Sequence, residues 1–187
     1  FKENMGLDWG NIIAALRYNH IFNKQWFSNV TFTYSRFQFD IGIETENSET
    51  QNGITFDSYD KLHYLSGIQD WSLKADFEYH PSPKHKILLG GSDIYHTFTP
   101  GKTTYQAKNP YIPDPIDMTL GNNLVYTHEI SLYIEDEYTL NSKIKLDGGV
   151  HFSMFPVKGK FYSSLQPRIN GRYLFAEKWS VKAAISK

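Results

Sequence analysis

The sequence predicts an all-β protein, a transmembrane antiparallel up-and-down β-barrel. The first observation is the stretch 71–80, where apolar and polar residues alternate without exception and so lie on opposite faces of a strand. The second is its length, since about ten alternating residues allow a tilted strand to cross a bilayer. The third is a contrast between short turns and long polar segments. Together they predict strands with lipid on one face and a watery lumen on the other.

Composition limits the classes of function. Of the 187 residues, 16% are aromatic and 40% apolar, as in membrane barrels, where every second strand residue faces water and aromatic rings gather at the interfaces. Lys plus Arg number 19 and Asp plus Glu 20, so no net field favours nucleic acid as a partner. The absence of cysteine excludes disulfides and cysteine-ligated metals. No window resembles a membrane helix, and the first four residues begin no signal peptide, so the chain is expected to start inside a mature protein.

Eight strands are expected, joined as four hairpins. Their ranges are 9–20, 26–39, 71–80, 87–98, 125–139, 143–155, 163–175 and 179 onward. Each carries apolar residues at every second position, which is the period of a strand. Pro81-Ser82-Pro83 is expected to reverse the chain after the third strand, because proline cannot donate to a sheet ladder and presets a turn dihedral.

Two turns carry the same pair of aromatic residues. Phe22 and Trp26 have a Phe-x-x-x-Trp spacing that recurs at Phe175 and Trp179, and all four share the parity of the apolar face. Amphipathic rings favour the headgroup level of a membrane. The four residues are therefore expected to form an aromatic girdle at one interface. The alternative is that they close the hairpins of a soluble protein by hydrophobic contact.

Alternation stops in two long segments. They cover about 41–65, which is rich in Glu, Asn, Ser and Thr, and about 99–124, which is rich in proline. Long segments at one end of a sheet and short turns at the other are the polarity of outer-membrane barrels. Both segments are expected to be extracellular loops, and residues 1–187 to be part of one transmembrane β-barrel domain.

The polar face of the strands carries charges of both signs. Burying unpaired ions costs several kcal/mol each, so this face is expected to line a watery lumen. Its charged residues are Arg17, Lys74, Asp76, Glu78, Glu129, Glu135, Glu137, Lys145, Asp147, Arg168, Arg172 and Lys182. Asp136 is an exception, because it shares the parity of the apolar Ile134 and Tyr138. A place near the membrane interface or a bulge would accommodate it.

No motif predicts catalysis, a metal site or a cofactor. Carboxylates two residues apart, such as Glu135 and Glu137, only repeat the period of the sheet. The seven histidines show no H-x-H or H-E-x-x-H spacing, and no G-x-S-x-G elbow occurs. Gly90-Gly91 and Gly148-Gly149 fall inside strands, where glycine marks a bulge, a bend or the close approach of another backbone. The chain is expected to be no enzyme and to need no cofactor.

Four stretches resemble the barrel portion of TonB-dependent outer-membrane receptors. They are residues 16–23, 27–36, 133–138 and 164–169. The resemblance covers nearly the whole chain and implies a barrel of about 22 strands in the cell outer membrane of a Gram-negative bacterium. It also implies a barrel closed by an N-terminal plug and opened by TonB, which takes up a scarce nutrient of the iron chelate, cobalamin or glycan class.

The resemblance implies partners as well. They are outer-membrane lipid, the plug domain of the same full-length chain, and the TonB complex acting through an N-terminal part. A surface lipoprotein that caps the pore is left open. The sequence departs from the family pattern because it has no plug and no TonB box and ends at Lys187 in mid-strand. It is therefore expected to form about eight strands of the larger barrel.

Tyr105 and Tyr111 are the candidate ligand contacts. Both lie in the proline-rich segment, and aromatic rings on preorganised loops stack against ring-shaped solutes. The alternative is that they only pack within the loop. Two other functions stay open at this point: a small stand-alone outer-membrane barrel with a structural or adhesive role, and a soluble β-sandwich that acts as a binding module.

Overall fold

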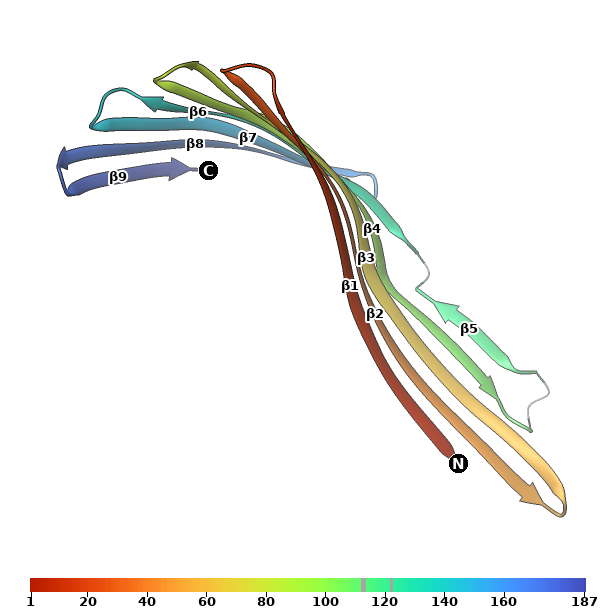
Figure 1. Ribbon diagram of the computed structural model, residues 1–187. Coiled ribbons are helices and arrows are strands. Elements are labelled where there is room, and N and C mark those ends of the chain that lie inside the picture. Colours follow the sequence, from red (N-terminus) through yellow and green to blue (C-terminus); the bar gives the residue numbers. More distant parts are fainter. Residues whose placement is uncertain (112–113, 122) are drawn as a thin grey trace. The chain divides into compact units, whose positions relative to one another are not determined.

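The computed structural model describes residues 1–111, 114–121 and 123–187, and every regular element in these ranges is a β-strand (Figure 1). The strands are β1 (Lys2–Ile21), β2 (Trp26–Gln51), β3 (Ile54–Ser82), β4 (His85–Lys108), β5 (Ile116–Leu120), β6 (Val125–Thr139), β7 (Ile144–Val157), β8 (Lys160–Ala176) and β9 (Trp179–Ser186). They form one sheet in the order β1-β2-β3-β4-β6-β7-β8-β9, with β5 beside β4. The predicted all-β, antiparallel up-and-down arrangement of eight consecutive strands is confirmed, and β5 is additional.

In unit 2 the sheet keeps its apolar residues on one face from strand to strand. Ile134 of β6 pairs with Val150 of β7, and Ile169 of β8 pairs with Ile185 of β9. Phe32 on β2 is 44% exposed, and the described residues form no second layer over this face. A soluble β-sandwich needs two packed sheets, whereas the described residues form one, so that alternative is wrong. In the described ranges β1 and β9 are the two ends of the order, and the sheet is not closed.

The sequence predicts a long irregular loop at about 41–65, and this prediction is wrong. The segment is the continuation of β2 and β3. The two strands extend to Gln51 and from Ile54, and only Asn52 and Gly53 separate them. Their φ angles are 52° and 78°. Two successive positive φ values define the two-residue turn whose twist matches a hairpin, and Asn-Gly is its favoured sequence. The expected long loop is thus one long hairpin with a tight end.

The segment 99–124 also contains more strand than expected. β4 runs to Lys108, and β5 pairs with it from Thr103, opposite Leu120, to Ala107, opposite Ile116. The parts of this predicted loop at 112–113 and 122 lie outside the described residues. Backbone pairing explains the difference, because β5 supplies ladder partners for the far end of β4.

The chain divides into two compact units. Unit 1 comprises 1–13, 35–70 and 97–126, and unit 2 comprises 14–34, 71–96 and 127–187. In unit 2 the apolar residues of β2 occupy even positions, such as Val30 and Phe32. In unit 1 they occupy odd positions, such as Phe39 and Ile41. Alternation therefore continues through unit 1 with the opposite parity. A pattern of apolar residues at the even positions of β2 accordingly ends where unit 1 begins.

In two of the short turns of unit 2, an asparagine side chain accepts hydrogen bonds from the backbone of the turn. Asn23 Oδ1 accepts hydrogen bonds from the backbone N–H groups of Gln25 and Trp26, at 2.8 and 3.0 Å. Asn141 Oδ1 accepts the equivalent bonds from Lys143 and Ile144, at 2.9 and 3.0 Å. An asparagine side chain that satisfies backbone donors in this way fixes a tight turn and hence the register of the strands it joins.

Candidate functional site

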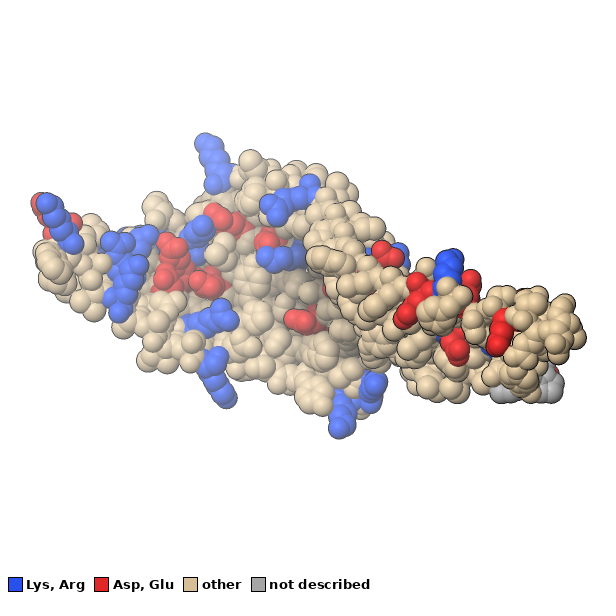
Figure 2. Space-filling model, turned by 90° about the horizontal axis from the view of Figure 1, so that it is seen from below, with Lys and Arg blue, Asp and Glu red and all other residues tan. Residues whose placement is uncertain are grey.

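Lysine–carboxylate ion pairs lie on the polar face of unit 2. Basic side chains of Lys or Arg and acidic side chains of Asp or Glu lie next to one another on the protein surface (Figure 2). On this face the pairs are Lys74 Nζ with Asp76 Oδ2 at 3.0 Å, Lys86 Nζ with Glu78 Oε2 at 3.4 Å, and Lys145 Nζ with Glu137 Oε1 at 3.0 Å. All are partly exposed, so water screens them and they add little to stability. Their consequence is a hydrated, polar surface.

Five of the residues predicted to face the lumen come together across β6 to β9. They line a hollow of about 440 Å³ and are Glu137, Lys145, Asp147, Arg172 and Lys182. The register places Lys145 opposite Arg172, which is in turn opposite Lys182. Three cations beside two carboxylates can bind a polar or charged partner through charge-assisted hydrogen bonds.

The other predicted lumen residues lie outside this group. Glu129 Oε2 is 3.6 Å from His96 Nε2, and Arg168 donates to Gln166 Oε1 at 3.3 Å. Arg17 on β1 and Glu135 on β6 do not line the hollow. The structure therefore brings only part of the predicted set together.

A tyrosine bridge crosses β4 on the polar face. Tyr133 of β6 donates its hydroxyl to Asp76 Oδ1 of β3 at 2.6 Å. The ring passes over Gly90, where an added Cβ would lie 2.9 Å from the Tyr133 hydroxyl and 2.5 Å from the carbonyl oxygen of Ala75. Glycine is therefore needed at position 90, which confirms the close approach that an in-strand glycine predicts.

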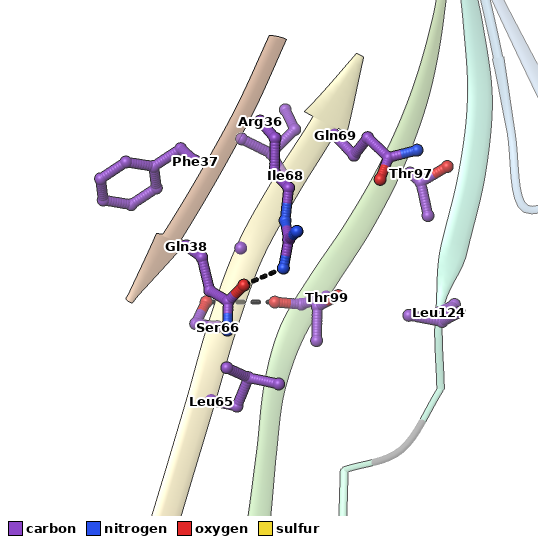
Figure 3. A pocket seen from close by; sticks show the side chains of 11 residues that line it. Arg36, Phe37, Gln38, Leu65, Ser66, Ile68, Gln69, Thr97, Thr99 and Leu124 are labelled. Carbon is purple, nitrogen blue, oxygen red and sulfur yellow. Dashed lines mark hydrogen bonds between the residues drawn. The ribbon is translucent and has the colours of Figure 1, made fainter. Parts of the chain in front are cut away.

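A second hollow, of about 240 Å³, lies within unit 1 (Figure 3). Arg36 donates to Gln38 Oε1, and Ser66 Oγ donates to the carbonyl oxygen of Thr99 at 3.1 Å. Gln69 adds an amide to the lining. The remaining lining residues are Phe37, Leu65, Gly67, Ile68, Thr97 and Leu124. A guanidinium, two amides and several hydroxyl groups beside aliphatic carbons suit a polar solute that carries negative charge or carbonyl oxygens.

The two predicted ligand contacts do not line this hollow. Tyr105 on β4 donates its hydroxyl to Asp60 Oδ1 at 2.7 Å, and this hydrogen bond raises the pKa of the phenol. Tyr111 is 76% exposed, and its ring stacks on Phe56 with the centroids 6.2 Å apart. Tyr111 thus offers an open ring face, whereas the Tyr105 hydroxyl is already engaged.

The aromatic residues of unit 2 fall into two rows. In the row near the short turns, Trp26 stacks on Tyr79 with centroids 4.3 Å apart. In the other row, the ring centroids of Tyr34 and Trp71 lie 4.5 Å apart. Phe22, between β1 and β2, is exposed, as are Phe175 near the end of β8 and Trp179 at the start of β9. The second row is not among the predicted features, although a Trp-x₅-Phe-x-Tyr pattern at 26–34 and again at 71–79 indicates both rows.

Metal binding finds no support in the part of the chain that the structure covers, because no three His, Asp or Glu side chains are grouped to hold an ion. Among the described residues there is also no helix long and apolar enough to cross a bilayer.

Comparison with protein families gives a match over almost the whole chain. The family described as "TonB dependent receptor-like, beta-barrel" matches residues 3–187. No curated protein matches the sequence.

Solved structures similar to this chain are barrels of longer proteins. BauA, the ferric preacinetobactin receptor from Acinetobacter baumannii, superposes with a TM-score of 0.60 at 13% identity, over 96% of this chain and 30% of that chain. A FadL homologue from Pseudomonas aeruginosa superposes with a TM-score of 0.52 at 9% identity, over 97% of this chain and 50% of that chain. The chain thus spans half or less of these proteins, and at such identities the similarity concerns the fold alone.

Proposed function

Because the chain belongs to the TonB-dependent receptor-like β-barrel family, we propose that it is part of an outer-membrane receptor that takes up a scarce nutrient with energy supplied through TonB. The family match over residues 3–187 is the observation that carries this proposal. The family is one of receptors and transporters of the outer membrane, so binding and transport, not catalysis, are the expected activities.

The two faces of unit 2 support a place in the membrane. One face carries aliphatic and aromatic side chains that no other layer covers in the part of the chain that the structure describes. The other face carries the ion pairs and the hollow lined by Glu137 and Lys145. A membrane barrel requires this division, because lipid accepts apolar side chains and a hydrated lumen accepts charged ones. In the full-length receptor the polar face would contact the plug domain and the passing solute.

The hollow of unit 1 is the proposed place of ligand capture. Its donors, above all the Arg36 guanidinium, suit the carboxylate, catecholate or carbonyl oxygens of an iron chelate. The iron chelate class is the one we propose to test first, and BauA, which has a similar fold, is named for a ferric chelate. Tyr111 is the second proposed contact, because its ring is open to solvent.

The test uses the full-length receptor in a strain that has no other receptor for the nutrient. Uptake of labelled ferric chelate should depend on TonB and should require the unit 1 hollow. Arg36→Ala should raise the KM about ten- to a hundredfold, the range expected for one lost hydrogen bond to a charged group. Lys178→Ala, in the turn between β8 and β9, is the matched control and should leave uptake unchanged.

Two results would overturn the proposal. Uptake that persists at the same rate without TonB would exclude energised transport. Equal uptake by the Arg36→Ala variant and the Lys178→Ala control would exclude the hollow as the place of capture, while leaving the family assignment intact.

A further inference from the structure

Two histidine-carboxylate pairs lie on the apolar face of unit 2, where charges are unexpected. The turn-side cluster consists of His85, Asp136 and Tyr138, in which His85 Nδ1 is 2.7 Å from Asp136 Oδ2 and the imidazole stacks on the tyrosine at 4.4 Å. This contact accounts for Asp136, the carboxylate that breaks the sequence pattern.

The loop-side cluster has the same composition and consists of His128, Asp93 and Tyr95. His128 Nδ1 is 3.0 Å from Asp93 Oδ1, and its ring lies 4.9 Å from the ring of Tyr95. Each cluster therefore combines a histidine from one strand with an aspartate and a tyrosine from the other. The turn-side histidine comes from β4 and the loop-side histidine from β6.

A repeated sequence produces this arrangement. Residues 85–95 and 128–138 both read His-x-Ile-x-Leu-x₃-Asp-x-Tyr, with every shared residue at an odd step and hence on one face. β4 and β6 are neighbours in the sheet, and Ser92 Oγ lies 2.8 Å from Ser131 Oγ on the opposite face. Two copies of one motif that run in opposite directions are related by a local two-fold axis, so each histidine meets the other copy's Asp and Tyr.

Only aliphatic residues and one glycine occupy this face between the clusters. They are Ile87, Leu89 and Gly91 on β4, and Ile130, Leu132 and Ile134 on β6. Leu132 and Ile134 are 52% and 55% exposed, and Leu132 packs where Gly91 has no side chain. The result is an apolar band with a polar, aromatic edge at each end.

The band has the height of a membrane. From His85 to Tyr95 there are ten steps of about 3.3 Å, or roughly 33 Å along the strand. At the tilt of about 40° found in outer-membrane barrels, this is about 25 Å along the bilayer normal, the height of their apolar band.

We propose that the two His-Asp-Tyr clusters lie at the two headgroup levels of the outer membrane and so set the depth of β4 and β6 in the bilayer. This inference rests on the proposed function, since it takes the apolar face of unit 2 as the lipid face. The partner is the lipid bilayer itself. Leu89 and Leu132 then lie at the middle of the hydrocarbon.

Charge and symmetry both favour lipid as the partner. A histidine paired with a carboxylate stays hydrated at an interface but would be expensive in hydrocarbon, whereas tyrosine prefers the headgroup level. A bilayer presents the same sequence of polar, apolar and polar layers from either side. The two-fold arrangement of the clusters matches that sequence, and a protein partner would impose no such symmetry.

The experiment measures depth with single spin labels on the full-length receptor in lipid vesicles. Cysteine is introduced singly, which is clean in this chain because it has none of its own. Labels at Leu89, Leu132, Tyr95 and Tyr138 report depth as the ratio of accessibility to oxygen and to a water-soluble nickel chelate. Ser131, on the polar face, is the matched control for Leu132. Folding of each variant is checked by heat-dependent migration on gels.

The expected result is a several-fold higher oxygen-to-nickel ratio at Leu89 and Leu132 than at Tyr95 and Tyr138, with the two tyrosine positions equal. A ratio that is highest at either tyrosine position would overturn the proposal and leave the proposed function standing. If the Ser131 label were in lipid and the Leu132 label in water, the face assignment would be reversed, and the proposed membrane placement would fall as well. Because β4 and β6 are labelled separately, loss of one variant leaves the other to decide.

Discussion

Replacement of Gly90 by alanine tests the tyrosine bridge on the polar face. The new Cβ would lie 2.5 Å from the carbonyl oxygen of Ala75, which is backbone and cannot move cheaply, and 2.9 Å from the hydroxyl of Tyr133. The strands must therefore separate locally, and the Tyr133 ring must leave Asp76. The variant therefore loses close packing and a hydrogen bond together.

The expected cost follows from these two parts. Overpacking a well-fitted site costs about 1–3 kcal/mol. The loss of the 2.6 Å hydrogen bond between Tyr133 and the Asp76 carboxylate costs about 1.5–3 kcal/mol. Gly90→Ala should thus lower the free energy of unfolding by about 2.5–6 kcal/mol. Gly148→Ala is the matched control, because nothing lies within 4 Å of its added Cβ, and it should change stability by less than about 1 kcal/mol.

The assay is equilibrium unfolding of the full-length receptor in vesicles by guanidinium, with Tyr133→Phe as a third variant. Tyr133→Phe keeps the ring and loses the hydrogen bond. If the bridge is already broken by Gly90→Ala, adding Tyr133→Phe should cost little more. Equal stability of Gly90→Ala and Gly148→Ala would refute the reasoning, as would full additivity of Gly90→Ala and Tyr133→Phe.

The remaining predictions concern single contacts. Asp60 raises the pKa of Tyr105, so the protonated phenol should favour the fold below the ordinary tyrosine pKa, and this contribution should vanish as pH rises through the raised value. Asp60→Asn should lower that pKa in a spectroscopic titration referenced to Tyr105→Phe. Gly53→Ala, at φ 78°, should cost about 1–2 kcal/mol and speed amide exchange at the hairpin end, whereas Gly10→Ala, in a strand, should not. Asn23→Ala should destabilise by about 1–2 kcal/mol in guanidinium unfolding, and Asn23→Asp, which keeps the acceptor oxygen, should not.

The eight strands were predictable from the sequence because alternation is a local signal. Every side chain from Trp71 to His80 reports its own face without reference to a neighbouring strand. The extension of β2 and β3 is harder to predict because the parity of their apolar residues changes along the strands. The Asn52-Gly53 turn signal lies inside a polar segment, where the chain forms a long hairpin and not the predicted loop.

The contacts that build the site were less predictable, because they depend on register between strands. Nothing local to Tyr133 indicates that its hydroxyl reaches Asp76, 57 residues earlier, and the charges of the unit 2 hollow meet only after four strands align. Asp136 shows the same limit from the other side. Its parity places a carboxylate on the apolar face, but the residue that pairs with it, His85, lies on a different strand.

The apolar residues of β2 and β3 change parity along the strands because the surroundings of the sheet change. The register in which the two strands pair does not shift. Tyr34 meets Trp71, and ten residues further along each strand Glu44 meets Lys61, so no residue is inserted between these pairs. Because the pairing register stays constant, the change from even to odd positions moves the apolar residues to the other face of the sheet. The two faces therefore contact different surroundings in the two parts of the strands.

The number of residues over which a strand keeps the parity of unit 2 is then a measure of the thickness of the apolar layer. On β2 and β3 the aromatic rows bound nine residues each, from Trp26 to Tyr34 and from Trp71 to Tyr79. On β4 and β6 the His-Asp-Tyr clusters bound eleven, from His85 to Tyr95 and from His128 to Tyr138. A tilted strand needs about 9–11 residues to cross hydrocarbon. On the proposed membrane placement, the aromatic rows and the His-Asp-Tyr clusters mark the same layer, as a bilayer with two polar edges requires.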